Sequence, residues 1–121
     1  MTVPAGLDVR PQEWETVRRI LQRLVPDREI WAFGSRVDGR AWAFSDLDLA
    51  IVGDQPLPAA RRAELREAFV ESELPWKVDL VDLASSSDTF RRIVQHRRVP
   101  VQAAALAAGA EMAMAEATDL S

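Results

Sequence analysis

The chain has 121 residues, 48% hydrophobic and 28% charged, which is typical of one globular domain with a modest core. Its net charge of −4 argues against a protein that binds nucleic-acid backbones. It has no cysteine, which excludes disulfides and thiolate metal sites. The N-terminal stretch does not resemble a signal peptide, and no apolar run approaches the about 20 residues of a membrane span. We therefore expect a cytoplasmic protein without direct nucleic-acid or membrane partners.

The first half of the chain alternates helical and extended patterns. Apolar residues at helical spacing predict a helix over 11–24, and the proline at 26 ends it. A short strand is expected over 29–33, followed by a Gly-Ser pair suited to open a short helix. A second strand with a buried centre is predicted over 46–52, and a charged amphipathic helix over 59–73.

The second half predicts one more strand and two helices. The strand is expected over 76–83, and serines at 85–87 offer N-caps for a helix that carries Phe90, Ile93 and Val94. The alanine-rich segment 102–117 favours a C-terminal helix, which either packs on its own domain or docks on a partner. This order predicts one α/β (α+β) domain over 1–121, with a small sheet flanked by helices.

Two aspartates stand side by side at the start of the second predicted strand. Residues i and i+2 of a strand face the same side, so Asp46 and Asp48 project together. Asp79, in the middle of the third predicted strand, joins them if the two strands are neighbours, whereas Asp82 points to the other face, in a solvated or capping role. Like charges this close favour a bound divalent cation such as Mg²⁺, which prefers oxygen ligands.

The Gly34-Ser35 pair lies ten residues before the aspartates. Glycine allows a backbone to approach a phosphate closely, and N–H groups at a helix start, with a serine hydroxyl, bind it. Arg36 follows and is predicted to add a charge-assisted phosphate contact. Alone, a Gly-Ser turn or an Asp-x-Asp is common and often structural. Their combination with a later strand aspartate is much more specific and predicts a site for a metal and a nucleotide.

The residues from Gly34 to Val52, GSRVDGRAWAFSDLDLAIV, together with the later VDLVDL, resemble the signature of the polymerase-β-type nucleotidyltransferase superfamily, and most closely its minimal nucleotidyltransferase (MNT) branch. The resemblance covers 31–83 well and the flanking helices loosely. It implies a mixed sheet with helices on one face, a nucleoside triphosphate and bound magnesium, with two ions expected. Many MNT proteins are antitoxins whose partner is a HEPN-domain toxin.

By this resemblance, the chain is expected to be an enzyme that transfers AMP from ATP to a hydroxyl, in the antitoxin case a tyrosine of the HEPN toxin. Asp46, Asp48 and Asp79 would be the catalytic and metal-binding residues, and Gly34 and Ser35 would bind the β- and γ-phosphates. At this length the chain has little room for an acceptor domain, so a partner protein is expected to supply the acceptor. Two alternatives remain open: an antitoxin that acts by binding alone, and a small-molecule nucleotidyltransferase.

Other residues have less specific interpretations. His96, the only histidine, is expected at the surface or a helix end, since one imidazole makes no metal site. Trp42 either packs or lines the acceptor site, and Lys77 shares the face of Asp79 near the phosphates. Four arginines are expected to form a solvated face or a basic edge: Arg91, Arg92, Arg97 and Arg98.

Overall fold

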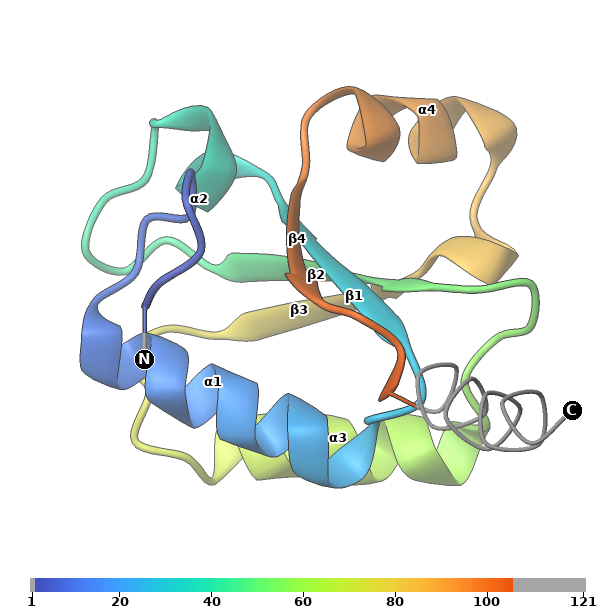
Figure 1. The fold of residues 1–121 in the computed structure, drawn as a ribbon, viewed down its shortest axis with the longest axis horizontal. Helices are drawn as coiled ribbons and strands as arrows, with labels where there is room; N and C mark the ends of the chain where they lie inside the picture. Colours follow the sequence, from blue (N-terminus) through green and yellow to red (C-terminus); the bar gives the residue numbers. More distant parts are fainter. Residues whose placement is uncertain (1, 106–121) are drawn as a thin grey trace, which may run out of the picture.

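The computed structural model describes residues 2–105 as a four-stranded sheet with helices on both faces (Figure 1). Helices α1 (Pro11–Leu24) and α3 (Ala59–Val70) lie side by side against one face, and α4 (Asp88–His96) lies over the other. A 3₁₀ turn, Leu83–Ser85, links the third strand to α4. The helices and strands are α1 (Pro11–Leu24), β1 (Glu29–Phe33), α2 (Ser35–Asp38), β2 (Leu47–Val52), α3 (Ala59–Val70), β3 (Val78–Asp82), α4 (Asp88–His96) and β4 (Val99–Gln102).

The strands are ordered β3-β2-β1-β4. β2 and β3 run parallel, whereas β1 is antiparallel to both β2 and β4. This confirms the expected mixed sheet, but the expectation of helices on one face alone is wrong, because α4 covers the face opposite to α1 and α3. Because β1 runs against β2, the end of β1 and the starts of β2 and β3 meet at one edge of the sheet. Three segments distant in sequence therefore converge there.

Alternation along β2 separates a core face from a polar face. Leu47, Leu49 and Ile51 are buried in the main core, which α1 and α3 complete with Trp14, Val17, Leu65 and Phe69. The residues between them, Asp48 and Ala50, face the α4 side, where a smaller apolar cluster contains Trp31, Leu83 and Val94. Burial of the leucine and isoleucine side chains, at about 25 cal/mol per Å² of apolar surface, fixes the register that turns Asp48 away from the core.

The predicted elements differ from the structure mainly at their ends. β2 begins at Leu47 rather than at residue 46, β3 covers 78–82 rather than 76–83, and α3 ends at Val70 instead of 73. Ser87 caps α4 as expected, because its hydroxyl accepts a hydrogen bond from the Phe90 N–H at 3.1 Å. Of the apolar residues that this helix carries, Val94 is buried, whereas Ile93 is 62% exposed.

The sequence did not predict β4. This strand adds to the free edge of β1 and contains Pro100, which an edge strand tolerates because that residue needs no ladder donor. The Gln102 Nε2 atom donates to the carbonyls of Val25 and Arg28, both at 2.9 Å, and ties the strand to the turn before β1. Gln102 was expected to begin a helix over 102–117; of that segment, 106–117 lies outside the described residues.

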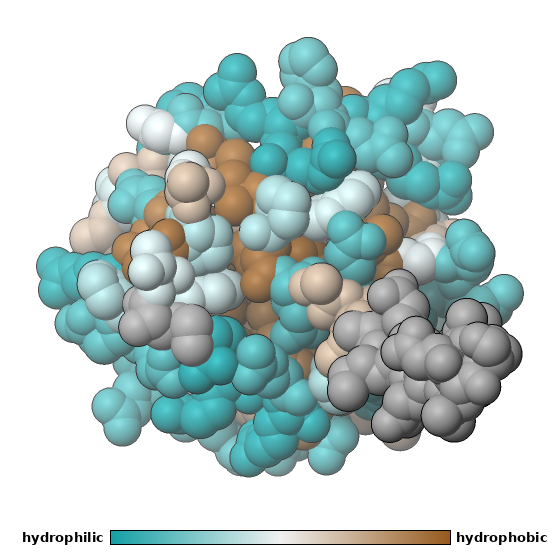
Figure 2. Space-filling model, in the orientation of Figure 1, coloured by the Kyte–Doolittle hydropathy of each residue, from teal (hydrophilic) through white to brown (hydrophobic). Residues whose placement is uncertain are grey.

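The surface in Figure 2 is hydrophilic around its periphery and hydrophobic near the middle of the visible face, in front of the sheet. In the part of the chain that the structure describes, no helix has the length and apolar character needed to cross a bilayer.

Candidate active site

The three predicted carboxylates lie at the sheet edge where β2 and β3 begin. Asp48 is the second residue of β2 and pairs in register with Asp79 of the parallel strand β3. Directly paired residues on parallel strands point to the same face, so both side chains lie on the α4 side of the sheet. Asp46 precedes β2 by one residue and is exposed, as is Asp79, whereas Asp48 is half-buried.

Asp48 has a strongly perturbed carboxyl group. Burial, and then the negative charges of Asp79 and Asp46, raise the pKa of Asp48 to about 6, from an ordinary value of 3.8. Both carboxylates are therefore close enough to Asp48 to disfavour its charged form electrostatically. This edge of the sheet concentrates negative charge that a bound cation would neutralise.

Gly34 brings the Gly-Ser turn against the carboxylates. Its φ of +82° lies in the left-handed region that favours glycine, and a Cβ atom at this position would overlap the Asp48 carboxylate. Ser35 begins α2, and its hydroxyl makes no hydrogen bond to any residue in 2–105. Because α2 follows Gly34 directly, the first backbone N–H groups of the helix lie at the same edge. The two halves of the motif are thus in contact.

Arg36 does not occupy a phosphate-binding position in the structure. It is 5% exposed, and its guanidinium donates to the carbonyl oxygens of Ser45 and Asp8, both at 2.9 Å, and of Ala43 at 3.2 Å. It also stacks on Trp76, 4.5 Å from the ring centroid. Adjacency to the Gly-Ser pair suggested a phosphate contact, but the helical turn directs Arg36 inward, where it holds the loop that leads to Asp46.

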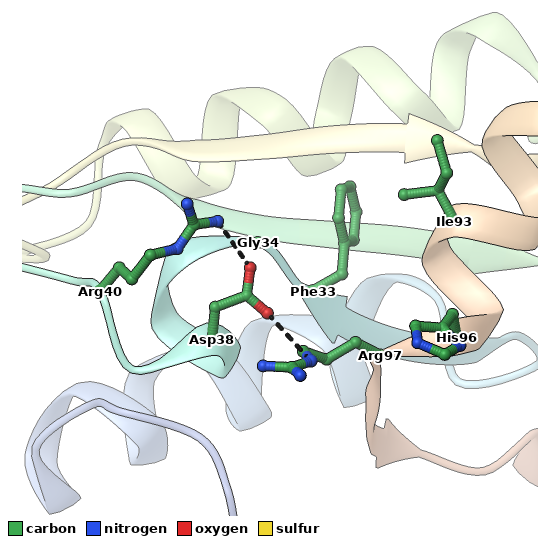
Figure 3. Close-up of a pocket in the computed structure, with 7 residues that line it drawn as sticks. All are labelled: Phe33, Gly34, Asp38, Arg40, Ile93, His96 and Arg97. Carbon is green, nitrogen blue, oxygen red and sulfur yellow. Dashed lines mark hydrogen bonds and ion pairs between the residues drawn. The ribbon is translucent and has the colours of Figure 1, made fainter.

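A cavity of about 440 Å³ opens between α2 and α4, beside Gly34 (Figure 3). Phe33 and Ile93 form its apolar side, and Arg40, His96 and Arg97 bring nitrogen donors. Asp38 lies between two of these cations, with its Oδ2 2.9 Å from Arg40 Nη2 and its Oδ1 3.6 Å from Arg97 Nε. Figure 3 shows both ion pairs converging on this carboxylate.

The sequence did not indicate this arginine–aspartate arrangement. Arg97 was expected in a solvated face or basic edge, and no role was predicted for Asp38 or Arg40. Asp38 is the last residue of α2, and Arg97 directly follows α4. No local sequence spacing relates positions so distant in the chain. His96 is exposed at the end of α4, as expected.

Asp82 points away from the site, as strand alternation predicted, but it is buried rather than solvated. Its side chain is 3% exposed, and its Oδ2 accepts hydrogen bonds from the Leu57 N–H at 2.6 Å and from Arg62 Nη2 at 2.9 Å. Both partners lie around the start of α3. Asp82 therefore anchors this helix to the sheet.

The carboxylates have the chemistry of a magnesium site. Carboxylate oxygens are the donors that a hard cation prefers; Asp48 and Asp79 share one face, and Asp46 is close enough for its charge to act on Asp48. The raised pKa of Asp48 is the electrostatic strain that such a cation would relieve. Within residues 2–105, no three acidic or histidine side chains are already gathered closely enough to hold a metal ion. Mutual repulsion between the carboxylates opposes such closure without a cation.

Residues 15–103 match the family model of the nucleotidyltransferase domain. The chain belongs to this family. It is 52% identical over 102 residues to a probable protein adenylyltransferase, MntA, of Haemophilus influenzae, a match that covers 84% of this chain and 90% of that protein. The predicted minimal nucleotidyltransferase is thereby confirmed.

Solved structures support the same fold. A toxin–antitoxin complex with AMP-PNP contains a chain that is 26% identical to this one, with a TM-score of 0.62, over 88% of this chain and 90% of that chain. A second complex, of a tri-AMPylated Shewanella oneidensis HEPN toxin with its MNT antitoxin, matches at 24% identity and a TM-score of 0.58, over 90% and 83% of the two chains. The latter shows the fold alone.

Proposed function

We propose that this chain is a magnesium-dependent protein adenylyltransferase that moves AMP from ATP to a tyrosine hydroxyl of a HEPN-domain toxin and thereby acts as its antitoxin. The observation that carries the proposal is the contact between Gly34 and the Asp48 carboxylate. It joins the turn proposed to bind phosphate to a carboxylate whose pKa is raised by burial and by the negative charges of Asp79 and Asp46. The adenylyltransferase relative and the neighbour with AMP-PNP favour ATP as the donor, and we expect the reaction to take place in the cytoplasm.

In the proposed reaction, the acceptor oxygen attacks the α-phosphorus and a new P–O bond forms. The bond from the α-phosphorus to the bridging oxygen breaks, and pyrophosphate leaves with that electron pair. Asp79, exposed beside Asp48, receives the hydroxyl proton or passes it to water. Asp46, Asp48 and Asp79 would hold magnesium, whose positive charge would neutralise the charge that develops on the reacting oxygens.

The other groups bind the donor. Gly34 and Ser35 contact the β- and γ-phosphates through backbone N–H groups and the Ser35 hydroxyl. The cavity beside Gly34 offers an apolar wall at Phe33 for the nucleoside, and arginine donors on its other side for phosphate oxygens. Arg36 is assigned no phosphate contact, because its donors are already bound to carbonyl oxygens.

The test is transfer of label from α-³²P-ATP to purified HEPN-domain proteins of the same genome, with Mg²⁺ or with EDTA. We expect labelled toxin only with Mg²⁺, and loss of labelling in Asp46→Asn and Asp48→Asn. Asp54→Asn is the matched control, since Asp54 is an exposed aspartate beyond the opposite end of β2. Toxin silenced without any label would support neutralisation by binding alone and refute transfer.

A further inference from the structure

Two large aromatic side chains are exposed together on the loop between α2 and β2. Trp42 is 68% and Phe44 63% exposed, and their rings contact edge-to-face with centroids 6.0 Å apart. Other large apolar residues exposed in 2–105, such as Val70, lie singly. Single exposed apolar residues are ordinary on protein surfaces, but a contiguous apolar patch marks an interaction site. We call Trp42 and Phe44 the aromatic pair.

The loop that carries the aromatic pair is held in place by hydrogen bonds from Arg36 and by hydrogen bonds within the loop itself. Beneath it, the buried Arg36 guanidinium donates to the Ser45 and Ala43 carbonyls. Within it, the Trp42 N–H donates to Ser45 Oγ, and the Ser45 N–H donates to the Trp42 carbonyl, both at 3.0 Å. The pair is therefore presented by an ordered turn, which reduces the entropy lost when a partner binds.

The aromatic pair borders the carboxylate edge. Phe44 lies two residues before Asp46, and the loop leads directly into β2. A cavity of about 410 Å³ is lined by the pair, by Pro75 and Trp76, which lead into the parallel strand β3, and by residues 8–10 and Glu13 around the start of α1. The pair and this cavity therefore lie where two of the carboxylate-bearing strands begin. The cavity beside Gly34 is lined instead by α4, so the two hollows flank the same edge.

We propose that the aromatic pair, with the hollow beside it, is the docking site for the protein that supplies the acceptor hydroxyl; this rests on the proposed function. A small acceptor is bound in an enclosing pocket, whereas a projecting aromatic pair suits insertion into an apolar surface of a protein. Docking here would bring a neighbouring tyrosine of that protein to the carboxylate edge. Arg36 is a positioning residue, because its hydrogen bonds to the loop fix the position of the aromatic pair relative to Asp46.

The experiment compares the wild type with Trp42→Ala/Phe44→Ala, using the HEPN-domain protein that the wild-type chain adenylylates. Calorimetry without ATP measures affinity for that protein, and steady-state labelling measures KM and kcat. We expect affinity to fall about tenfold or more and KM to rise in parallel, with kcat little changed. ATP affinity and melting temperature should stay at wild-type values, because both side chains are exposed. Trp42→Phe should retain most of the affinity.

Val70→Ala is the matched control, since Val70 is 77% exposed on α3, which covers the other face of the sheet. Equal acceptor affinity in the wild type and the double variant would overturn the proposal. Loss of ATP affinity would make the pair part of the donor site, and a change from dimer to monomer would make it a contact between copies; either result also overturns it. If the wild type labels no HEPN-domain protein, the proposed function fails first, a distinct result.

Discussion

Replacing Asp48 by asparagine should stabilise the metal-free protein at pH 8 while abolishing nucleotide transfer. The folded pKa is about 6, above the ordinary 3.8, so folding is penalised once this group is charged. The penalty is absent below pH 4, grows between pH 4 and 6, and is constant above that range. Asparagine has nearly the same shape and no charge, so it removes the penalty and still fits against Gly34.

The pKa difference sets the size of this effect. A difference of about 2 units corresponds to at most about 3 kcal/mol. Asp48 is half-buried beside two exposed carboxylates, so solvent and salt screen part of it, and we expect about 1–2 kcal/mol. For a domain of this size, such a gain raises the melting temperature by about 4–8 °C.

Urea unfolding in EDTA at pH 4 and pH 8 measures this directly. The gain in Asp48→Asn should be present at pH 8 and close to zero at pH 4, and Asp54→Asn should show no such pH dependence. Mg²⁺ with ATP should stabilise the wild type and not the variant. An Asp48→Asn protein that is less stable than the wild type at pH 8, or stabilised equally at both pH values, would refute the electrostatic reasoning.

Two further substitutions test one close contact at the site and one buried ion pair that anchors α3 to the sheet. Gly34→Ala should lower the free energy of unfolding by about 1–3 kcal/mol and remove most of the ATP affinity, because alanine is strained at this φ and its Cβ overlaps Asp48. Gly39→Ala is the control, since Gly39 shares the positive φ but has no neighbour within 4 Å of the added Cβ. An equal loss of stability in the thermal melts of both variants would contradict the role of the overlap. Arg62→Gln should cost about 2 kcal/mol in urea unfolding at pH 7, because the buried Asp82 carboxylate loses its cation, and a loss within the ordinary surface range of about 0.5 kcal/mol would contradict this.

Local sequence patterns predicted the elements well where they have clear ends. The first helix covers 11–24 as expected, because Pro11 begins it and Pro26 follows its end. Strand alternation correctly turned Asp48 away from the buried leucines on either side of it. Asp79 shares its face because β3 lies beside β2, which is the condition on which that prediction depended. β4 escaped prediction because a four-residue edge strand with a proline has no pattern that distinguishes it from a loop.

Side-chain direction on a short helix is harder to predict than strand alternation. Ser35 and Arg36 are adjacent in sequence, yet successive helical residues differ by about 100° around the axis. Arg36 consequently enters the interior while Ser35 begins the turn that contacts the carboxylate edge. The ion pair between Asp38 and Arg97 likewise depends on the placement of α4 over the sheet, which only the tertiary structure determines.

The direction of Arg36 connects the two halves of the site physically. Its backbone belongs to the helix that follows the Gly34-Ser35 turn, while its guanidinium donates to the carbonyls of Ala43 and Ser45, next to Asp46. One buried side chain thus couples the position of the Gly-Ser turn to that of the first carboxylate and of the aromatic pair. In the proposed reaction, donor phosphates and acceptor must meet in line within fractions of an ångström. Under that proposal, the link through Arg36 would let one small domain align a donor with an acceptor that another protein supplies.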